Sequence, residues 1–201
     1  GLAAKILKIP LVIHDSDAHP GLTNRILAKW STAIATGAPL KYYPYPKSIT
    51  RYIGIPIDKS FVPIDATARA EKKELMGFDG SKPLIVITGG GLGAKRINDA
   101  VAMRLDDMLQ ISSVLLISGT SQYDALRAVT PHDDKRFQLY AFVSEGMSDM
   151  LGAADIVVAR AGATTILELV ALARPTILIP NGFLTAGHQL KNAAVYAENG
   201  A

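Results

Sequence analysis

The chain has 201 residues, of which 49% are apolar, so it is long enough to bury the core of one large or two small domains. No apolar run reaches the roughly 18 residues of a membrane-spanning helix, which leaves only surface attachment to a membrane open. The formal net charge of +3 comes from scattered basic residues, which disfavours nucleic acid as a partner. The absence of cysteine excludes disulfides and thiol chemistry and fits a reducing compartment.

Both ends of the sequence predict that the chain is a fragment. It begins at Gly1 without Met or a signal-peptide pattern, and GLAAKILK is typical of the last part of an amphipathic helix. It ends in ENGA, which is typical of a helix C-terminus with more protein behind it.

The first quarter of the chain predicts a short parallel sheet that carries polar residues at its edge. The apolar run at 10–14 predicts a buried strand that delivers His14, Asp15, Ser16 and Asp17 to its carboxyl end, where open α/β sheets place ligands. We then expect a helix at 22–30, a weak strand at 32–36 and an irregular segment at 41–48, since its prolines do not fit a central strand. Gly54 and Pro56 in the segment 52–57 indicate a crossing between domains, with the boundary near residue 56.

The rest of the chain alternates strictly between apolar strands and helices, which predicts an α/β fold with a doubly wound parallel sheet. The expected strands are 83–88, 113–118, 137–142, 155–159 and 175–180. The expected helices are 66–76, 94–109, 121–129, 147–151, 164–172 and 186–198.

The stretch RAGATTILE, residues 160–168, predicts an anion-binding turn. A strand that ends in small residues and restarts as a helix offers unpaired backbone N–H groups and the positive end of a helix dipole. Glu168 lies four residues after Thr164, on the same helix face, where its carboxylate could accept two hydroxyl hydrogen bonds. The alternative is that Glu168 is an ordinary glutamate in the first turn of a helix, where its interaction with the helix dipole stabilises the helix by about 0.5 kcal/mol. The small residues around Thr165 leave room above the helix end and favour a ligand.

Two further clusters follow predicted strands. The glycine-rich loop that begins GGGLG at Gly89 has the context of a phosphate loop, although such loops also serve only to pack a helix on a sheet. It lacks a Walker lysine and the acidic residue of a nicotinamide site. His188, Gln189 and Asn192 lie within one helical turn, either as a solvated face or as ligand contacts, and their position at a strand end favours ligand contacts.

The sequence predicts no metal site. His14, Asp15 and Asp17 crowd into one turn and match zinc spacing poorly. The turn at 132–134, HDD, fits a solvated surface.

Six motifs in register resemble those of the MurG-type glycosyltransferases, the UDP-N-acetylglucosamine transferases that complete the lipid-linked precursor of bacterial peptidoglycan. They run through nearly the whole chain. The motifs are HDSDAHPGLTNRILA, YIGIPI, GGGLGAKRIN, AFVSEGM, ARAGATTILELVALARPTILIP and GHQLKNA.

This resemblance implies a GT-B type architecture of two Rossmann-like domains with parallel sheets, the N-terminal one incomplete here. Residues 1–55 would be the C-terminal part of the acceptor domain, and residues 56–201 the UDP-sugar-binding domain without its C-terminal end. It also implies UDP-N-acetylglucosamine and a lipid-linked acceptor as partners, no cofactor, and a peripheral place on the cytoplasmic face of the membrane through the missing N-terminal domain.

The resemblance also implies roles for particular residues. Glu168 matches the glutamate that binds the ribose hydroxyls, and Ala163, Thr164 and Thr165 match the helix start that faces the diphosphate. Val143 matches the residue whose backbone meets uracil, and Gln189 one that reaches the sugar hydroxyls. Further candidates for contact with the UDP-sugar are Asp17, Gly91, His14, His188, Asn192 and Gly93. The catalytic base is unassigned and expected upstream of Gly1, so the fragment alone would be inactive.

Three departures from the family pattern bear on the ligands. Asp17 is a carboxylate where the family has a neutral amide near the donor sugar. Asp58 replaces an arginine suited to the diphosphate, so like charge there would weaken donor binding. Gly91 lacks the hydroxyl of a serine.

Three hypotheses follow. The first is an inverting, metal-independent transfer of N-acetylglucosamine to a lipid-linked muramoyl peptide. The second keeps the fold but has diacylglycerol or another lipid as the acceptor, and the third is a non-catalytic nucleotide-sugar-binding protein. UDP-sugar 2-epimerases, which share the architecture, fit the GHQLKNA motif less well.

Overall fold

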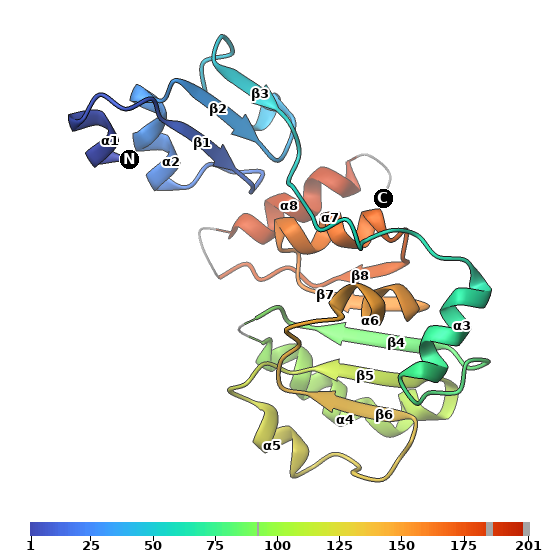
Figure 1. Ribbon diagram of the computed structural model, residues 1–201. Coiled ribbons are helices and arrows are strands. Elements are labelled where there is room, and N and C mark those ends of the chain that lie inside the picture. Colours follow the sequence, from blue (N-terminus) through green and yellow to red (C-terminus); the bar gives the residue numbers. More distant parts are fainter. Residues whose placement is uncertain (92, 184–186, 199–201) are drawn as a thin grey trace. The chain divides into compact units, whose positions relative to one another are not determined.

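The computed structural model describes residues 1–91, 93–183 and 187–198, and the chain forms two compact units (Figure 1). Unit 1 comprises Gly1–Ile57, Ala161–Leu167 and the described residues from Pro180 onward. Unit 2 comprises Asp58–Arg160 and Glu168–Ile179. The first passage between the units lies between Ile57 and Asp58, and the domain boundary near residue 56 stays a prediction.

Unit 1 contains a three-stranded parallel sheet in the order β1-β2-β3. Ile13 pairs with Ile34, and Ile34 with Thr50, so apolar residues from adjacent strands share the buried face. The strands are β1 (Val12–Asp15), β2 (Ala33–Thr36) and β3 (Thr50–Tyr52). The helices are α1 (Leu2–Ile6), α2 (Leu22–Leu27), α8 (His188–Ala197) and the short 3-10 turns η1 (Ala28–Trp30) and η2 (Leu40–Tyr42).

The third strand of this sheet was not predicted. β3 has only three residues and a single buried one, Thr50, so it gives no alternating pattern. The predicted irregular segment at 41–48 is confirmed, yet Tyr43 and Tyr45 are buried in the core with their rings stacked at 5.7 Å between centroids. The two tyrosines belong to the same buried cluster as Ile13 and Ile34.

Unit 2 contains a five-stranded parallel sheet in the order β6-β5-β4-β7-β8. The predicted parallel sheet is therefore confirmed, and counted along the chain its strand order is 3-2-1-4-5, as in Rossmann-type folds. The strands are β4 (Leu84–Thr88), β5 (Ser113–Ile117), β6 (Phe137–Tyr140), β7 (Ile156–Ala159) and β8 (Thr176–Leu178). The helices are α3 (Ala66–Leu75), α4 (Lys95–Ile111), α5 (Tyr123–Arg127), α6 (Met147–Ala153) and α7 (Ala163–Ala171), whose first residues belong to unit 1.

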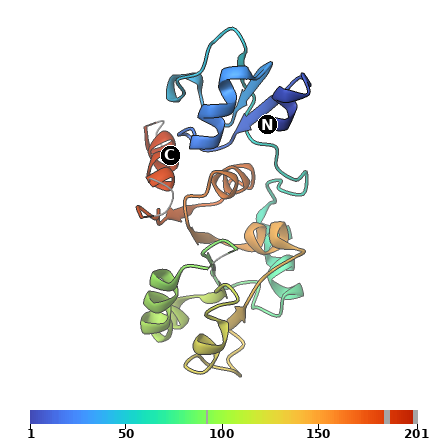
Figure 2. The ribbon, with the colours of Figure 1, turned by 90° about the vertical axis from the view of Figure 1, so that its left-hand side faces the viewer.

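Helices cover both faces of this sheet, α4 on one side and α3 with α6 on the other (Figure 2). All five residues of β5 are buried, because a central strand packed on both faces needs apolar side chains in both directions. One core joins Val101 and Leu105 of α4 to Val114 and Leu116, and the other joins Leu151 of α6 to the opposite sheet face.

The strand order reverses between β4 and β7, which pair directly from Ile85 with Ile156 to Thr88 with Ala159. Open α/β sheets bind ligands outside the carboxyl ends of strands at such a reversal. The glycine-rich loop follows β4 and the turn at 160–162 follows β7. No helix among the described residues is long and apolar enough to cross a membrane.

Candidate functional site

The stretch RAGATTILE folds as predicted into a turn and a helix. β7 ends at Ala159, α7 begins at Ala163, and Ile166 donates its backbone N–H to the Gly162 carbonyl at 3.0 Å. Thr164 is exposed, and Thr165 is half-buried. The first backbone N–H groups of a helix have no acceptor within it, so this turn offers donors to an anion.

Glu168 lies one turn into the same helix and is half-buried. Burial raises the pKa of its carboxyl above the usual range. Among the residues that the structure describes, none donates a hydrogen bond to this carboxylate or pairs with it as a cation. A partly desolvated carboxylate without donors is unfavourable, so its oxygens are available to the hydroxyls of a ligand.

The glycines of the loop after β4 divide into two kinds. Gly93 has φ +72°, and a Cβ there would lie 2.3 Å from the Ser118 carbonyl oxygen, so close packing and backbone conformation both require glycine. Gly90 also has positive φ, and its N–H donates to the Thr88 hydroxyl at 3.2 Å. Gly91 is different, since a Cβ there would meet open space. Packing therefore explains Gly93, whereas Gly91 has room above it for a ligand.

Val143 lies in the segment between β6 and α6 and is half-buried. The predicted strand at 137–142 ends earlier, at Tyr140, because the chain turns away there toward α6. The Val143 side chain packs against the core of unit 2, which fixes the backbone around it. The contact expected of Val143 is one between its backbone and uracil. A side chain that is packed in the core leaves the backbone atoms able to make that contact.

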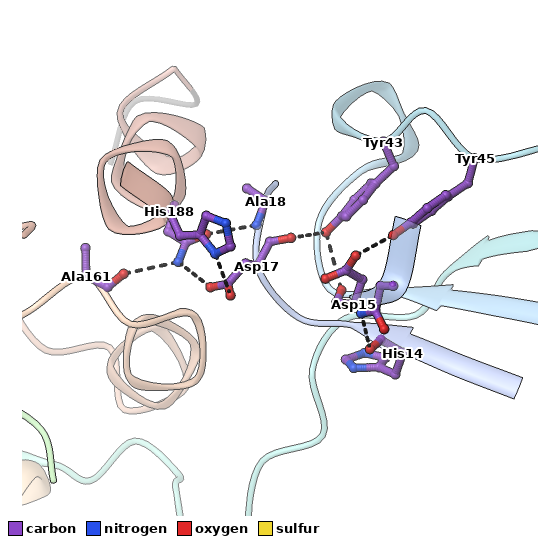
Figure 3. Close-up of polar contacts among 10 residues, drawn as sticks. His14, Asp15, Asp17, Ala18, Tyr43, Tyr45, Ala161 and His188 are labelled. Carbon is purple, nitrogen blue, oxygen red and sulfur yellow. Dashed lines mark hydrogen bonds and ion pairs between the residues drawn. The ribbon is translucent and has the colours of Figure 1, made fainter. Parts of the chain in front are cut away.

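In unit 1, Asp17 is held by two residues of α8 (Figure 3). Asn192 donates Nδ2 to Asp17 Oδ1 at 2.9 Å, and His188 Nδ1 lies 3.2 Å from Asp17 Oδ2. Asn192 also donates to the Ala161 carbonyl at 3.2 Å and accepts from the Ala18 N–H at 2.9 Å. Through these hydrogen bonds Asn192, which is only 3% exposed, fastens the loop after β1 to the turn before α7.

The remaining predicted residues of unit 1 already have protein partners. Gln189 accepts the Asn181 N–H at 2.8 Å through Oε1, which leaves its amide nitrogen for other contacts. His14 donates Nε2 to the Gly54 carbonyl at 2.9 Å. Asp15 was expected at the edge of the sheet, open to a ligand; it is instead buried and accepts the Tyr45 hydroxyl at 2.6 Å.

Unit 1 also holds a cavity of about 270 Å³ beside these residues. Its lining includes Ser16, Tyr52, Ala163, Asn192 and Tyr196. No group of three or more histidine and carboxylate side chains suited to a metal ion occurs within the described part of the chain.

The candidates thus form one set in each unit. Unit 2 carries Gly91, Gly93, Val143 and Glu168. Unit 1 carries Asp17, His14, Ala163, Thr164, Thr165, His188, Gln189 and Asn192. Sequence reasoning missed the two tyrosines that hold the loop after β1: Tyr45 at Asp15, and Tyr43, whose hydroxyl donates to the Asp17 carbonyl at 2.7 Å. The only sequence signal was the Tyr-rich composition of that segment.

Comparison with known proteins places this chain in one family. Residues 84–201 match the family described as glycosyltransferase family 28 C-terminal domain. Curated relatives include a UDP-N-acetylglucosamine–N-acetylmuramyl-(pentapeptide) pyrophosphoryl-undecaprenol N-acetylglucosamine transferase of an Exiguobacterium species, 32% identical over 199 residues, which are 98% of this chain and 54% of the relative. The protein of the same name from Clostridium botulinum is 33% identical over 202 residues, 99% of this chain and 54% of the relative.

Solved structures give the same result. The crystal structure of Acinetobacter baumannii MurG matches with a TM-score of 0.73 and 26% identity, over 100% of this chain and 54% of that one. Anabaena HepE, solved with UDP and glucose, matches with a TM-score of 0.57 and 13% identity over 98% of this chain and 63% of that one, a likeness of fold alone. The predicted resemblance to MurG-type proteins and the GT-B type fold are confirmed, and the chain spans about half the length of the curated relatives it matches.

Proposed function

We propose that this chain, which belongs to the glycosyltransferase family 28 through its C-terminal domain, is part of an inverting enzyme that transfers N-acetylglucosamine from UDP-N-acetylglucosamine to a lipid-linked muramoyl peptide. The curated relatives carry the name of this activity. The single observation in favour that comes from the molecule itself is Glu168, a half-buried carboxylate without a donor among the described residues, one turn after an anion-binding helix start.

In this proposal the donor is held by its nucleotide. Glu168 accepts hydrogen bonds from both ribose hydroxyls, and the backbone N–H groups at Ala163, Thr164 and Thr165 bind the diphosphate. The backbone at Val143 meets the uracil, and Gly91 gives the phosphates close access to the loop after β4. Asp17 and Gln189 contact hydroxyls of the sugar.

The chemical step breaks the bond between the anomeric carbon and the diphosphate as the acceptor hydroxyl attacks from the opposite side. Negative charge then grows on the leaving UDP. Oriented N–H groups and the dipole of α7 stabilise that charge without reorganisation, a form of electrostatic catalysis. The resemblance implies that this occurs without a metal ion and at the cytoplasmic face of the membrane, with the enzyme bound peripherally.

The test is transfer by the full-length protein from radiolabelled UDP-N-acetylglucosamine to two acceptors, a lipid-linked muramoyl pentapeptide and diacylglycerol, with buffer alone as the control. Labelled product only with the first acceptor supports the proposal. Product with diacylglycerol would make the protein a glycolipid synthase. Donor binding without transfer or hydrolysis would make it a nucleotide-sugar-binding protein.

A further inference from the structure

Asp17 and His188 of unit 1 form a carboxylate–imidazole pair, 3.2 Å from Oδ2 to Nδ1. An ionised carboxylate only accepts hydrogen bonds, so Nδ1 is the donor. When imidazole is neutral, a proton on Nδ1 leaves the lone pair on Nε2. The contact with Asp17 therefore fixes the tautomer in which Nε2 is a base.

The pair is fixed before any ligand arrives. Asp17 is held at its side chain by Asn192 and at its backbone carbonyl by the Tyr43 hydroxyl, at 2.9 and 2.7 Å. His188 is the first residue of α8. It follows the N-cap residue Gly187, whose φ of 75° is a conformation that glycine adopts readily. The His188 side chain is 11% exposed and that of Asp17 36%. Such preorganisation is what proton transfer at a defined atom requires.

The alternative interpretation is that the Asp17–His188 pair has a purely structural role and only tethers α8 to the loop after β1. Asn192 already joins the same helix to the same loop with two hydrogen bonds and to the turn before α7 with a third, and it is an uncharged residue suited to that task. His188 adds a single bond to Asp17 and keeps Nε2 without a partner among the described residues. An Nε2 atom that no described residue hydrogen-bonds favours a chemical role.

We propose that His188 is the proton acceptor of the transfer reaction and that Asp17 is its positioning residue, an inference that rests on the proposed function. Nε2 takes the proton of the acceptor hydroxyl while the hydroxyl oxygen forms its bond to the anomeric carbon. The bond from that carbon to the diphosphate breaks, and UDP leaves with the electron pair. The imidazolium so formed lies beside the Asp17 carboxylate, which stabilises it.

Other ionisable groups surround the pair and contribute to its pH dependence. The His19 ring meets His188 edge-on at 5.6 Å between centroids. Arg25 of α2 and Lys191 of α8 place positive charges near these rings, and Asp15 of β1 a negative one. Burial lowers the pKa of His19 most, and the charges of Lys191, His188 and Arg25 lower it further. The experiment must therefore distinguish the effect of His19 from that of His188.

The experiment measures kcat, KM and UDP affinity of the full-length protein across pH for His188→Gln, His188→Ala, Asp17→Asn and His19→Gln. Glutamine keeps a polar side chain but takes no proton, so His188→Gln should lower kcat by about 10²-fold or more and leave UDP affinity unchanged. The acid limb of the pH–rate profile should disappear in that variant and persist in His19→Gln. Added imidazole should restore part of the activity of His188→Ala. Asp17→Asn should lower kcat less than His188→Gln does. His132→Gln, at an exposed histidine of unit 2, is the matched control and should behave as wild type.

The outcomes separate the two proposals. Wild-type kcat in His188→Gln, or loss of activity in His188→Ala that imidazole does not restore, would overturn the dyad while the transferase function stands. No transfer by the wild-type protein, despite donor binding, would refute the proposed function and the reaction step with it. Nitrogen-15 NMR of His188 provides a readout independent of turnover: the proton should be on Nδ1 in the wild type, and a proton on Nε2 would contradict the dyad.

Discussion

Lys73 donates its ammonium group to Asp155 Oδ2 at 2.5 Å from a side chain that is only 5% exposed. The same carboxylate oxygen accepts the Leu84 N–H at 2.8 Å, and Arg69 lies 3.2 Å from the other oxygen. Asp155 directly precedes β7, and Leu84 begins β4. One carboxylate thus joins α3 to the starts of the two strands that lead into the glycine-rich loop and the RAGATTILE turn.

Asp155→Asn should therefore destabilise the protein by about 3 kcal/mol, because it leaves a buried lysine without its counter-charge. Urea unfolding followed by circular dichroism measures the change. Asp99→Asn is the control: its pair with Lys95 is exposed on α4, and its loss should change the free energy of unfolding by less than about 0.5 kcal/mol. Equal effects of the two substitutions would contradict a special role for the buried pair.

The Asp155 pair should also make stability depend on pH. Burial alone would raise the pKa of Asp155, but the hydrogen bonds from Lys73 and Leu84 and the charges of Lys73 and Arg69 outweigh it and hold the pKa below its usual range. A carboxyl group whose pKa is lowered by folding stabilises the folded protein fully at pH values above its pKa in the unfolded chain, about 3.9. This stabilisation is lost as the pH falls through the pKa of the group in the folded protein. The difference in unfolding free energy between wild type and Asp155→Asn should shrink from pH 6 to pH 3. A constant difference would contradict this assignment.

The fold of unit 2 could be predicted because its signals are local. Each strand of the central sheet is a short apolar run, as in β5, and each is separated from the next by a helical pattern. Unit 1 was less predictable, since β3 is too short for a pattern and the core depends on Tyr43 and Tyr45 from an irregular segment. Their burial is decided by contacts with β1 and β2, which composition does not encode.

The candidate site divides in the same way. The sequence pattern of a strand, a small-residue turn and a helix predicted correctly that Thr164 and Glu168 lie on one helix, because that geometry is set within ten residues. The contact of Asp17 with Asn192 joins residues 175 positions apart, so no local pattern predicts it. The burial of Asp15 against Tyr45, rather than at an open edge, was missed for the same reason.

Gly91 and Gly93, two of the glycines in the loop after β4, should respond oppositely to added side chains. Gly93→Ala forces a Cβ to 2.3 Å from the Ser118 carbonyl at positive φ and should cost at least about 1 to 2 kcal/mol of stability. Gly91→Ser meets open space, so its stability should stay within about 0.5 kcal/mol of wild type, and its new hydroxyl should tighten UDP binding. Thermal unfolding and calorimetry measure both. A destabilised Gly91→Ser would show that the loop has no room for a ligand.

Glu168→Ala should weaken UDP binding by roughly 1.5 to 3 kcal/mol, since two hydrogen bonds to a charged group are lost. Calorimetry with the full-length protein measures the affinity, with Glu145→Ala as the control at an exposed glutamate of unit 2. Burial raises the pKa of Glu168, so its acceptor form is lost as the pH falls through a value above the usual one for glutamate. Wild-type affinity should therefore fall between pH 7.5 and pH 5 more steeply than that of Glu168→Gln. Unchanged UDP affinity in Glu168→Ala would remove the ribose assignment.

Asp58→Arg should strengthen binding of the UDP-sugar, because it introduces the cation that the resemblance to MurG-type proteins implies at this position. The hydrogen bond from the Ser60 N–H, and then the Ser60 hydroxyl, lower the pKa of Asp58, so the residue is an anion at neutral pH. The chain offers a close control in Asp79, which is also exposed in unit 2 and accepts the N–H of the residue two positions on, Ser81, at 2.9 Å, as Asp58 accepts that of Ser60 at 2.8 Å. Asp58→Arg should raise affinity several-fold at low salt and less at high salt, and Asp79→Arg should leave it unchanged. Equal gains in both variants would mean that only the net charge matters and that residue 58 has no specific place near the diphosphate.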